Sequence, residues 1–347
     1  MTDMKNLYLE NSEEDAEIDE DEDIEPEDAS ITTPFDPTEI RVDTRPMTID
    51  LVLERIKYEE INLAPDFQRH ADIWTPIAKS RLIESILIRI PLPAFYMDAT
   101  NEDKWLVIDG LQRLSTLKKF AIDNELRLKG LEFFPNLEGK NYKELPRNYQ
   151  RRIRETVLTI YLIEKGTPPE VKFNIFRRIN TGGEPLSPQE LRHALNPGQA
   201  TKFLDRLAKY KEFRIATNIT KKRQERMDDH EFILGFVAFY LTPYKDYPIK
   251  QGRDFFLNES MLKINAMSQK QLNEIAECFQ STMITANYIF GKYAFRKVFR
   301  NHKKLQPLNK SLFEAWSVIL SKINSEEIEI LKNQKELLLD KFISYIE

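Results

Sequence analysis

Hydrophobic residues in the first half of the chain alternate between helical and strand-like spacing. Apolar residues recur at helical spacing after Met47 and again after Thr75-Pro76, a pair typical of an N-cap and first helical position. Short β-branched and aromatic runs between them are typical of strands. The pattern predicts a helix from about residue 48, a helix at 76–90, a hairpin of strands 93–97 and 104–108, a helix at 111–121 and a strand at 156–163. These elements predict a small α/β domain over residues 46–165.

From Pro168 onward almost every apolar pattern has helical spacing. A capping box at Ser187-Pro188-Gln189-Glu190 marks one helix start, shortly after the paired glycines Gly182 and Gly183. Helices are predicted at 171–179, from 187 onward, and at 200–210, 228–240, 269–289, 312–323 and 326–346. The second half therefore predicts an all-helical domain over residues 166–347, and the whole chain is predicted to have an α+β fold.

The net charge of -5 is unevenly distributed along the 347 residues. Residues 1–40 contain sixteen Asp and Glu but only one basic residue, Lys5. Of the chain's 51 Lys+Arg and 56 Asp+Glu, 50 and 40 therefore lie beyond residue 40, which gives that part a net charge of +10. A run of like charges with few apolar residues repels itself and cannot form a core. Residues 1–45 are predicted to be a disordered acidic tail and linker.

Cysteine and histidine are too few and too scattered for several kinds of site. The single cysteine, Cys278, cannot form an internal disulfide, and the four histidines lack the close spacing of structural zinc ligands. The longest apolar run, from Ile233 to Leu241, is far shorter than the ~20 residues of a membrane helix. We therefore expect a cytoplasmic protein that does not enter a membrane and has no metal site of its own.

The stretch Val107 to Arg113 predicts a strand that turns through Asp109-Gly110 directly into a helix. At such a junction the unpaired N–H groups of the first helical turn attract an anion, and glycine lets a phosphate approach the backbone. Arg113 in the first turn could donate two hydrogen bonds to a phosphate. In the alternative interpretation, Asp109 caps the helix and Arg113 is a solvated surface residue.

Two other polar stretches are candidates for the same site. Gln68 and Arg69 lie in a loop between the first two helices, where they are either ligands or ordinary polar residues. Asn180-Thr181-Gly182-Gly183 joins two predicted helices, and its glycines suit either an anion-binding nest or a helix C-cap. On spacing alone, the helix-cap interpretation is favoured.

The order of these motifs resembles the N-terminal domain family of the GmrSD-type restriction systems, the domain of unknown function numbered 262. The resemblance covers roughly residues 46–320. It rests on Phe67-Gln68-Arg69, Leu82 to Leu87 with Pro91-Leu92-Pro93, Ile108 to Arg113, Arg178 to Leu186 with Glu190-Leu191-Arg192, and Arg226 to Glu231.

This resemblance implies a ParB- and sulfiredoxin-like fold that binds a nucleoside triphosphate, with or without Mg²⁺, and in some members hydrolyses it. Catalysis is then expected from Asp109, Gln112 and Arg113. Nucleotide binding is expected from Gln68, Arg69, Asp109, Gly110, Arg113, Asn180 and Gly182. Leu111 stands where the hydrolytic members carry glutamine, and a leucine cannot orient a water molecule. Turnover is expected to be slow or absent if that glutamine positions water, and to survive if it only packs at the turn.

The full-length systems of this family also carry an HNH-type nuclease half. The late histidine His302 has no second motif of metal ligands after it, so we do not expect this chain to cleave DNA by itself. Basic clusters nevertheless make a phosphate backbone a candidate partner. The predicted nucleic-acid contacts are Arg151, Arg152, Lys221, Lys222, Arg223, Lys303 and Lys304.

The leading hypothesis is a nucleotide-binding regulatory module of a bacterial defence or DNA-transaction system, which lacks its own nuclease. Two alternatives remain open on the sequence. The first is a noncatalytic DNA-binding module, in which Arg113 and the basic clusters contact phosphates of DNA. The second is an interaction subunit that recruits a separate nuclease or another defence protein.

Overall fold

The computed structural model describes residues 41–63, 74–179, 186–300 and 304–347, and it divides into two compact units. The sheet unit extends to Pro197 and includes 225–227, whereas the helical unit contains 198–224 and 228–347. The named strands of the described residues all belong to the sheet unit, which confirms the predicted α+β fold class. The acidic tail predicted for the N-terminus lies outside the described residues up to residue 40.

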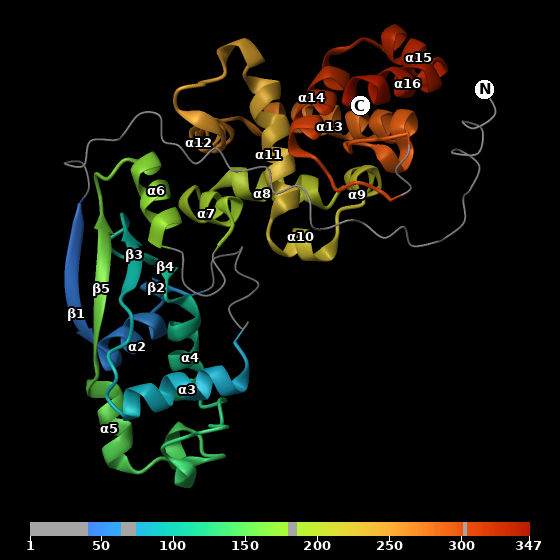
Figure 1. The fold of residues 1–347 in the computed structure, drawn as a ribbon. Helices are drawn as coiled ribbons and strands as arrows, with labels where there is room; N and C mark the ends of the chain where they lie inside the picture. Colours follow the sequence, from blue (N-terminus) through green and yellow to red (C-terminus); the bar gives the residue numbers. More distant parts are fainter. Residues whose placement is uncertain (1–40, 64–73, 180–185, 301–303) are drawn as a thin grey trace. The chain divides into compact units, whose positions relative to one another are not determined.

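A five-stranded mixed sheet forms the centre of the sheet unit (Figure 1). The strand order is β1-β5-β3-β4-β2, in which β3 and β4 are the predicted antiparallel hairpin and β5 is parallel to β3. The elements of this unit are β1 (Val42–Thr48), α2 (Ile49–Lys57), β2 (Ile61–Asn62), α3 (Pro76–Leu87), β3 (Phe95–Ala99), β4 (Trp105–Asp109), α4 (Leu111–Ala121), α5 (Arg147–Glu155), β5 (Val157–Glu164), α6 (Pro169–Ile179) and α7 (Pro188–Leu195).

The edge strand β1 lies partly in the stretch predicted as a linker. It pairs antiparallel with β5 from Val42 opposite Ile163 to Thr48 opposite Val157. Pro46 is compatible with this position because an edge strand has one side without ladder hydrogen bonds. Residues 42–45 therefore belong to the sheet, and the structure differs there from the sequence-based expectation.

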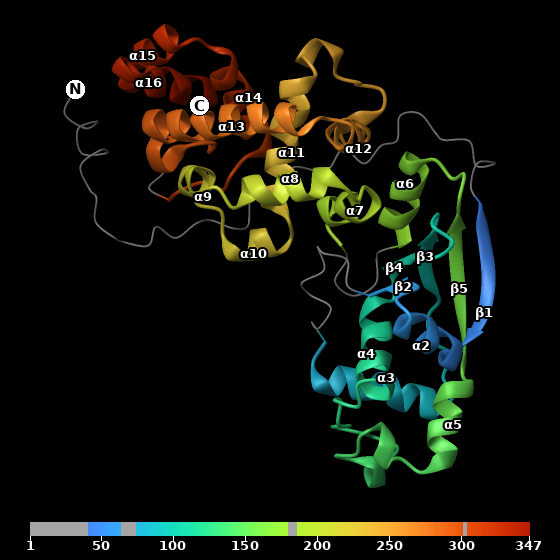
Figure 2. The same cartoon turned by 180° about the vertical axis from the view of Figure 1, so that it is seen from behind.

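Different helices cover the two faces of the sheet (Figures 1 and 2). Buried residues of α2, α3 and α4 pack on the face that contains Phe95, Met97 and Ile160. On the other face, the α6 and α7 side chains pack against Ile108 and Ile163; they are Phe173, Phe176 and Leu191. The sheet unit therefore continues past the boundary predicted near residue 165, because α6 and α7 bury their apolar sides against this sheet.

The carboxylate of Glu84 on α3 organises the irregular segment after α4. Its oxygens accept hydrogen bonds from the backbone N–H groups of Glu132, Phe133 and Phe134, at 3.1, 2.6 and 3.2 Å. These bonds satisfy backbone donors outside regular secondary structure and offset the cost of burying the carboxylate. Glu84, which belongs to the Leu82 to Leu87 motif, therefore has a structural role.

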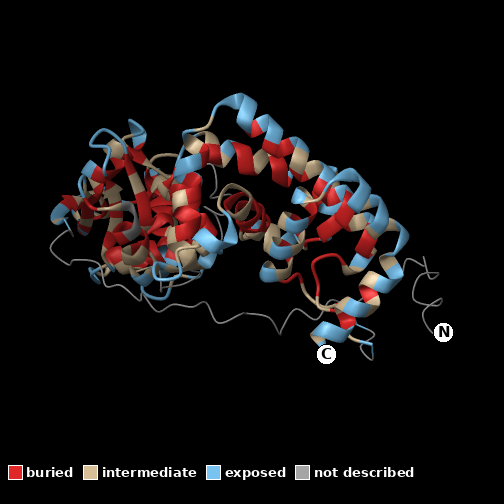
Figure 3. Ribbon diagram, turned by 90° about the horizontal axis from the view of Figure 1, so that it is seen from above, coloured by how far each residue is buried: buried red, intermediate tan, exposed pale blue. Residues whose placement is uncertain are grey.

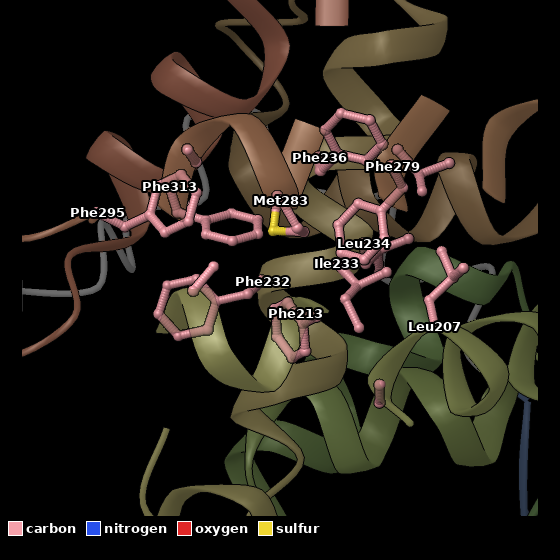
Figure 4. Packing of buried hydrophobic residues seen from close by; sticks show 14 of the residues in the cluster. Leu207, Phe213, Phe232, Ile233, Leu234, Phe236, Phe279, Met283, Phe295 and Phe313 are labelled. Atoms are coloured by element: carbon pink, nitrogen blue, oxygen red, sulfur yellow. The ribbon is translucent and has the colours of Figure 1, made fainter. Parts of the chain in front are cut away.

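Phenylalanine side chains from α9, α11, α13 and α14 build much of the core of the helical unit (Figure 4). Phe313 lies among three other rings, with centroid distances of 6.1 Å to Phe213, 5.1 Å to Phe232 and 4.5 Å to Phe295. Buried residues follow the inward sides of these helices, whereas the outward sides are exposed (Figure 3). The unit thus has a core of its own.

The helices of the helical unit include those predicted at 200–210, 228–240, 269–289 and 312–323. None of the described helices combines the length and hydrophobicity that crossing a membrane requires. The bounds are α8 (Gln199–Ala208), α9 (Lys211–Thr217), α10 (Lys221–Glu225), α11 (Asp228–Leu241), α12 (Gly252–Asn265), α13 (Gln269–Phe290), α14 (Lys310–Lys322), α15 (Ser325–Asn333) and α16 (Lys335–Ile346).

A buried histidine joins α8 to the start of α11. Nδ1 of His230 lies 2.7 Å from Oδ1 of Asp229, and Nε2 lies 3.5 Å from Oδ1 of Asp205. Burial alone would lower the pKa of His230, but the two carboxylates outweigh it and raise that pKa to about 9. The imidazole is therefore a buried cation at neutral pH, and it also lowers the pKa of Asp205.

We expect the helical unit to lose stability as the pH rises from 6.5, the unperturbed pKa of histidine, to about 9. The folded state holds a proton over this range that the unfolded state releases, so the contribution is complete below the lower pKa and lost through the higher one. The loss should be on the order of 1–3 kcal/mol. Urea unfolding of the full chain, followed at several pH values, measures it. His230→Gln should flatten the decline; an equally steep decline in this variant would assign the effect to another group.

Candidate functional site

A β-bulge sets the direction of the chain where β4 meets α4. Asp109 lies opposite Tyr96, and Val107 lies opposite Met97, so Ile108 is an extra residue on β4. Bulges bend a strand and re-aim its side chains, and they are common beside active sites. This bulge places Asp109 at the end of the strand and at the start of the helical turn.

Gly110 is required at this turn for two steric reasons. It is the N-cap residue of α4 and has a φ of 99°, a left-handed conformation that favours glycine. A Cβ atom built on it would also lie 2.3 Å from Cδ1 of Phe95. Among the described residues no side chain caps α4, so Asp109 does not have the capping role considered in the alternative interpretation. The first turn therefore presents its N–H groups without a side-chain cap.

The Arg113 side chain is buried, and it forms hydrogen bonds within the sheet unit. Its guanidinium donates hydrogen bonds to the backbone oxygen of Pro93, to that of Ala94 at 3.1 Å and to Oδ2 of Asp109 at 2.8 Å. It also lies over the ring of Phe95, 4.3 Å from the centroid. With 9% of its surface exposed, Arg113 is not a solvated surface residue. It connects the start of β3 to the end of β4.

Asp109 is the ionisable group of this junction that reaches solvent, with 27% of its side chain exposed. Burial raises the pKa of Asp109. The charge of Arg113, a hydrogen bond from the backbone N–H of Gly110 and a hydrogen bond from Arg113 oppose that rise without cancelling it. Burial in turn lowers the pKa of Arg113, which Asp109 opposes. A carboxylate with a raised pKa beside a fixed cation is suited to accept or donate a proton in a reaction.

The family comparison covers the stretch that contains this junction. Residues 50–196 match the family model described as GmrSD restriction endonuclease, N-terminal domain. This stretch resembles a GmrSD N-terminal domain. The match ends next to Pro197, the last residue of the main segment of the sheet unit. No curated protein and no solved structure matched the chain. The family resemblance is thus confirmed for residues 50–196. Its predicted continuation to residue 320 and its ParB- and sulfiredoxin-like part stay predictions.

Several residues predicted for the site of the GmrSD N-terminal domain lie outside the described residues. They are Gln68, Arg69, Asn180 and Gly182. The capping box that follows the paired glycines is present as predicted: Ser187 Oγ accepts from the N–H of Glu190 at 3.1 Å, and the Glu190 carboxylate accepts from the N–H of Ser187 at 2.5 Å. The helix after the glycine motif therefore begins where the sequence indicates.

The two residues after Gly110 have different environments. Leu111 is 9% exposed and belongs to the main core cluster of the sheet unit. Gln112 is half-buried, and its backbone oxygen accepts a hydrogen bond from Thr116 Oγ1 at 2.7 Å. Leu111, at which the chain departs from the motif expected from the resemblance, is therefore a core residue.

The predicted nucleic-acid contacts divide into exposed and structural residues. Exposed side chains are Arg151, Lys221, Lys222 and Lys304, and Lys303 lies outside the described residues. Arg152 instead donates to the backbone oxygen of Leu87 at 2.8 Å, and Arg223 donates to Asp228 Oδ2 at 2.8 Å. The exposed members of the set are the ones suited to bind phosphates.

Sequence reasoning missed a buried ion pair that attaches α6 to the sheet. Nζ of Lys172 lies 3.2 Å from Oδ2 of Asp98 on β3, and their side chains are 9% and 12% exposed. Lys172 also donates to Thr100. A lysine within an amphipathic helix gives no sequence signal of such burial, and its partner lies 74 residues away.

We expect Arg113→Ala to lower the free energy of unfolding of the sheet unit by about 2–4 kcal/mol, because it leaves a partly buried carboxylate and two carbonyl groups without this donor. Arg151→Ala is the matched control, since its side chain is 67% exposed. The control should change stability by no more than about 0.5 kcal/mol. Denaturant unfolding of the full chain, followed by circular dichroism, measures both. Equal midpoints for the two variants would contradict the structural role of Arg113.

Proposed function

We propose that the sheet unit is the nucleotide-binding regulatory module of a restriction-type defence system, and that a nucleoside triphosphate binds at the β4–α4 junction. The match to the GmrSD N-terminal domain supports the defence context. The observation that carries the proposal is the uncapped start of α4 behind Gly110, next to a partly exposed carboxylate. Backbone N–H groups and the positive end of a helix dipole bind phosphate well.

The proposal gives Asp109 and Arg113 different roles. Asp109 is the group that contacts the ligand, whereas Arg113 is a positioning residue whose hydrogen bonds fix the Asp109 carboxylate. Phosphate binding then depends on the N–H groups of the first turn of α4, because the backbone N–H of Gly110 already donates to the Asp109 carboxylate. Mg²⁺ commonly binds one or two carboxylates together with nucleotide phosphates, and Asp109 is the residue that would hold it here.

Hydrolysis requires a base that accepts a proton from the attacking water. The raised pKa of Asp109 brings its carboxylate closer to the range in which a general base works well. Leu111 is packed in the core and cannot take part. The proposal therefore assigns the reaction in this chain to Asp109.

We expect the full chain to bind at least one of ATP, GTP, CTP and UTP, and Asp109→Asn to reduce phosphate release by about 100-fold. Asparagine retains an oxygen that can accept from Arg113, so the fold should be preserved. Asp123→Asn, near the other end of α4 and paired with Lys118, is the control and should hydrolyse as the parent does. Calorimetry with and without Mg²⁺ measures binding, and a phosphate assay measures turnover. If none of the four nucleotides binds, the proposal fails.

A DNA-binding role for the helical unit is the second candidate, because the structure joins two basic clusters that are distant in the sequence. Arg223 of α10 donates to the backbone oxygen of Leu308 at 3.3 Å. Arg296 donates to the backbone oxygens of Thr217 at 2.8 Å and Gln306 at 2.6 Å. These bonds hold α10, with its exposed lysines, beside the segment that follows α13.

Replacing Lys221 and Lys222 by glutamate should weaken binding of a DNA duplex and make it less sensitive to salt. Each phosphate contact contributes about 0.9 to the slope of log affinity against log salt concentration, so the slope should fall by roughly 1–2. The double variant Lys245→Glu, Lys250→Glu has the same charge change at exposed residues and is the control. Equal slopes in both double variants would exclude α10 from a DNA interface.

A further inference from the structure

Four strands of the sheet place polar and aromatic residues in one row that ends at Asp109. The register sets Thr44 opposite Tyr161, Tyr161 beside Tyr96, and Tyr96 opposite Asp109. Residues in register on neighbouring strands point to the same face of a sheet. The rings of Tyr96 and Tyr161 stack, with centroids 5.0 Å apart and an interplanar angle of 24°. The stacked pair thus lies on the same row as the candidate site.

This row lies at the border between the part of the sheet face that α6 and α7 cover and a part that is exposed to solvent. Tyr96 packs against the cluster formed with α6 and α7, which lies toward the end of β5 (Figure 1). At the start of β5, the same face is open: Thr159 is exposed and Val157 is 59% exposed. Pro46, which is opposite Thr159 on β1, is exposed as well. Tyr161 is therefore half-buried, with the second tyrosine on one side and the open strip along its own strand.

We propose that Tyr161, supported by Tyr96, is the stacking surface for the base of the nucleoside triphosphate bound at Asp109. This inference rests on the proposed function of the β4–α4 junction. Neighbouring strands are about 5 Å apart, so Tyr161 lies about 10 Å across the sheet from the strand of Asp109. Tyr96 covers the ring face of Tyr161 that is turned toward β4, so the base stacks on the opposite face, toward β1, and the nucleotide is extended across the row.

An aromatic surface recognises a base in a way that differs from phosphate binding. Every base has a π-face, so stacking on tyrosine adds affinity with little sequence preference. Burial, together with the nearby Tyr161 and Asp109, raises the pKa of Tyr96, and its hydroxyl therefore stays protonated as a hydrogen-bond donor. The stacking surface takes a base of any kind, and a purine, with its larger ring system, should bind more tightly than a pyrimidine.

Calorimetric titration of the full chain with ATP, GTP and inorganic tripolyphosphate tests this inference. Tyr161→Leu keeps an apolar side chain on the strand but removes the ring, and it should weaken ATP and GTP binding about 10-fold or more. Tyr161→Phe should bind both as the parent does. Tripolyphosphate has no base, so its affinity should be the same for all three proteins. Thr159→Ala, on the same face two residues earlier, is the control and should change nothing.

The outcomes separate this inference from the proposed function. If the parent binds nucleotides but Tyr161→Leu binds them equally tightly, the stacking surface is wrong and the phosphate site stands. If Tyr161→Leu loses tripolyphosphate as well, its effect is on the fold or the phosphate site, and the stacking role is overturned. If the parent binds neither nucleotides nor tripolyphosphate, both proposals fail. Thermal unfolding of each variant, measured alongside, confirms that the proteins compared are folded.

Discussion

The guanidinium of Arg113 holds together three parts of the chain that meet at the candidate site. Its acceptors are the carbonyl groups of Pro93 and Ala94, just before β3, and the carboxylate of Asp109 at the end of β4. A buried cation is tolerated only when its donors are satisfied, and a buried carboxylate needs donors in the same way. Strand, turn and helix are therefore held together by one electrostatic arrangement.

Arginine has the same role elsewhere in the protein. Arg296 donates to two backbone carbonyl groups in the helical unit, where burial and the nearby Arg223 lower its pKa to about 10. Arg152 donates to the carbonyl of Leu87 at the end of α3. The planar, multiple-donor guanidinium suits such contacts better than lysine does. A cluster of arginines in this sequence is thus a mixture of structural donors and surface charges, and only the surface charges are available to a nucleic acid.

The sequence predicts the strongly periodic elements well, because their spacing and caps are local properties. The hairpin of β3 and β4, the helices α3, α4, α8, α11 and α13, and the strand β5 lie within a few residues of their predicted positions. The sequence does not predict β1, because the local pattern around Pro46 contains charged residues and does not reveal the pairing of this strand with β5. α12 was missed because its apolar residues are spread around the helix. Periodicity identifies α6 and α7 as helices, but it does not show which core they join.

At the candidate site, the sequence identifies the turn between β4 and α4. It does not identify the groups that contact each site residue. Asp109-Gly110 is recognisable because a strand pattern changes to a helix pattern around a residue pair suited to turns. The acceptors of Arg113 are mainly backbone carbonyl groups, which carry no residue identity and lie 20 and 19 residues earlier in the chain. The stacking of Tyr96 on Tyr161 likewise depends on the register between β3 and β5. Long-range register and backbone acceptors are therefore the parts of the site that require a structure.

The burial of Leu111 explains how the turn is retained without the glutamine of the hydrolytic motif. Successive residues of a helix point about 100° apart, so Leu111 and Gln112 have different surroundings: Leu111 belongs to the core cluster, whereas Gln112 is half-buried and its side-chain Oε1 atom is shielded from solvent. A glutamine at residue 111 would place its amide among apolar side chains, where an unpaired polar group is costly. Gln112 cannot take over that direction without rotating the helix. In the proposed site, turnover then depends on the Asp109 side chain, whereas phosphate binding depends on the N–H groups of the first turn of α4. On this proposal different groups carry the two properties, so a chain with this motif can lose hydrolysis and retain binding.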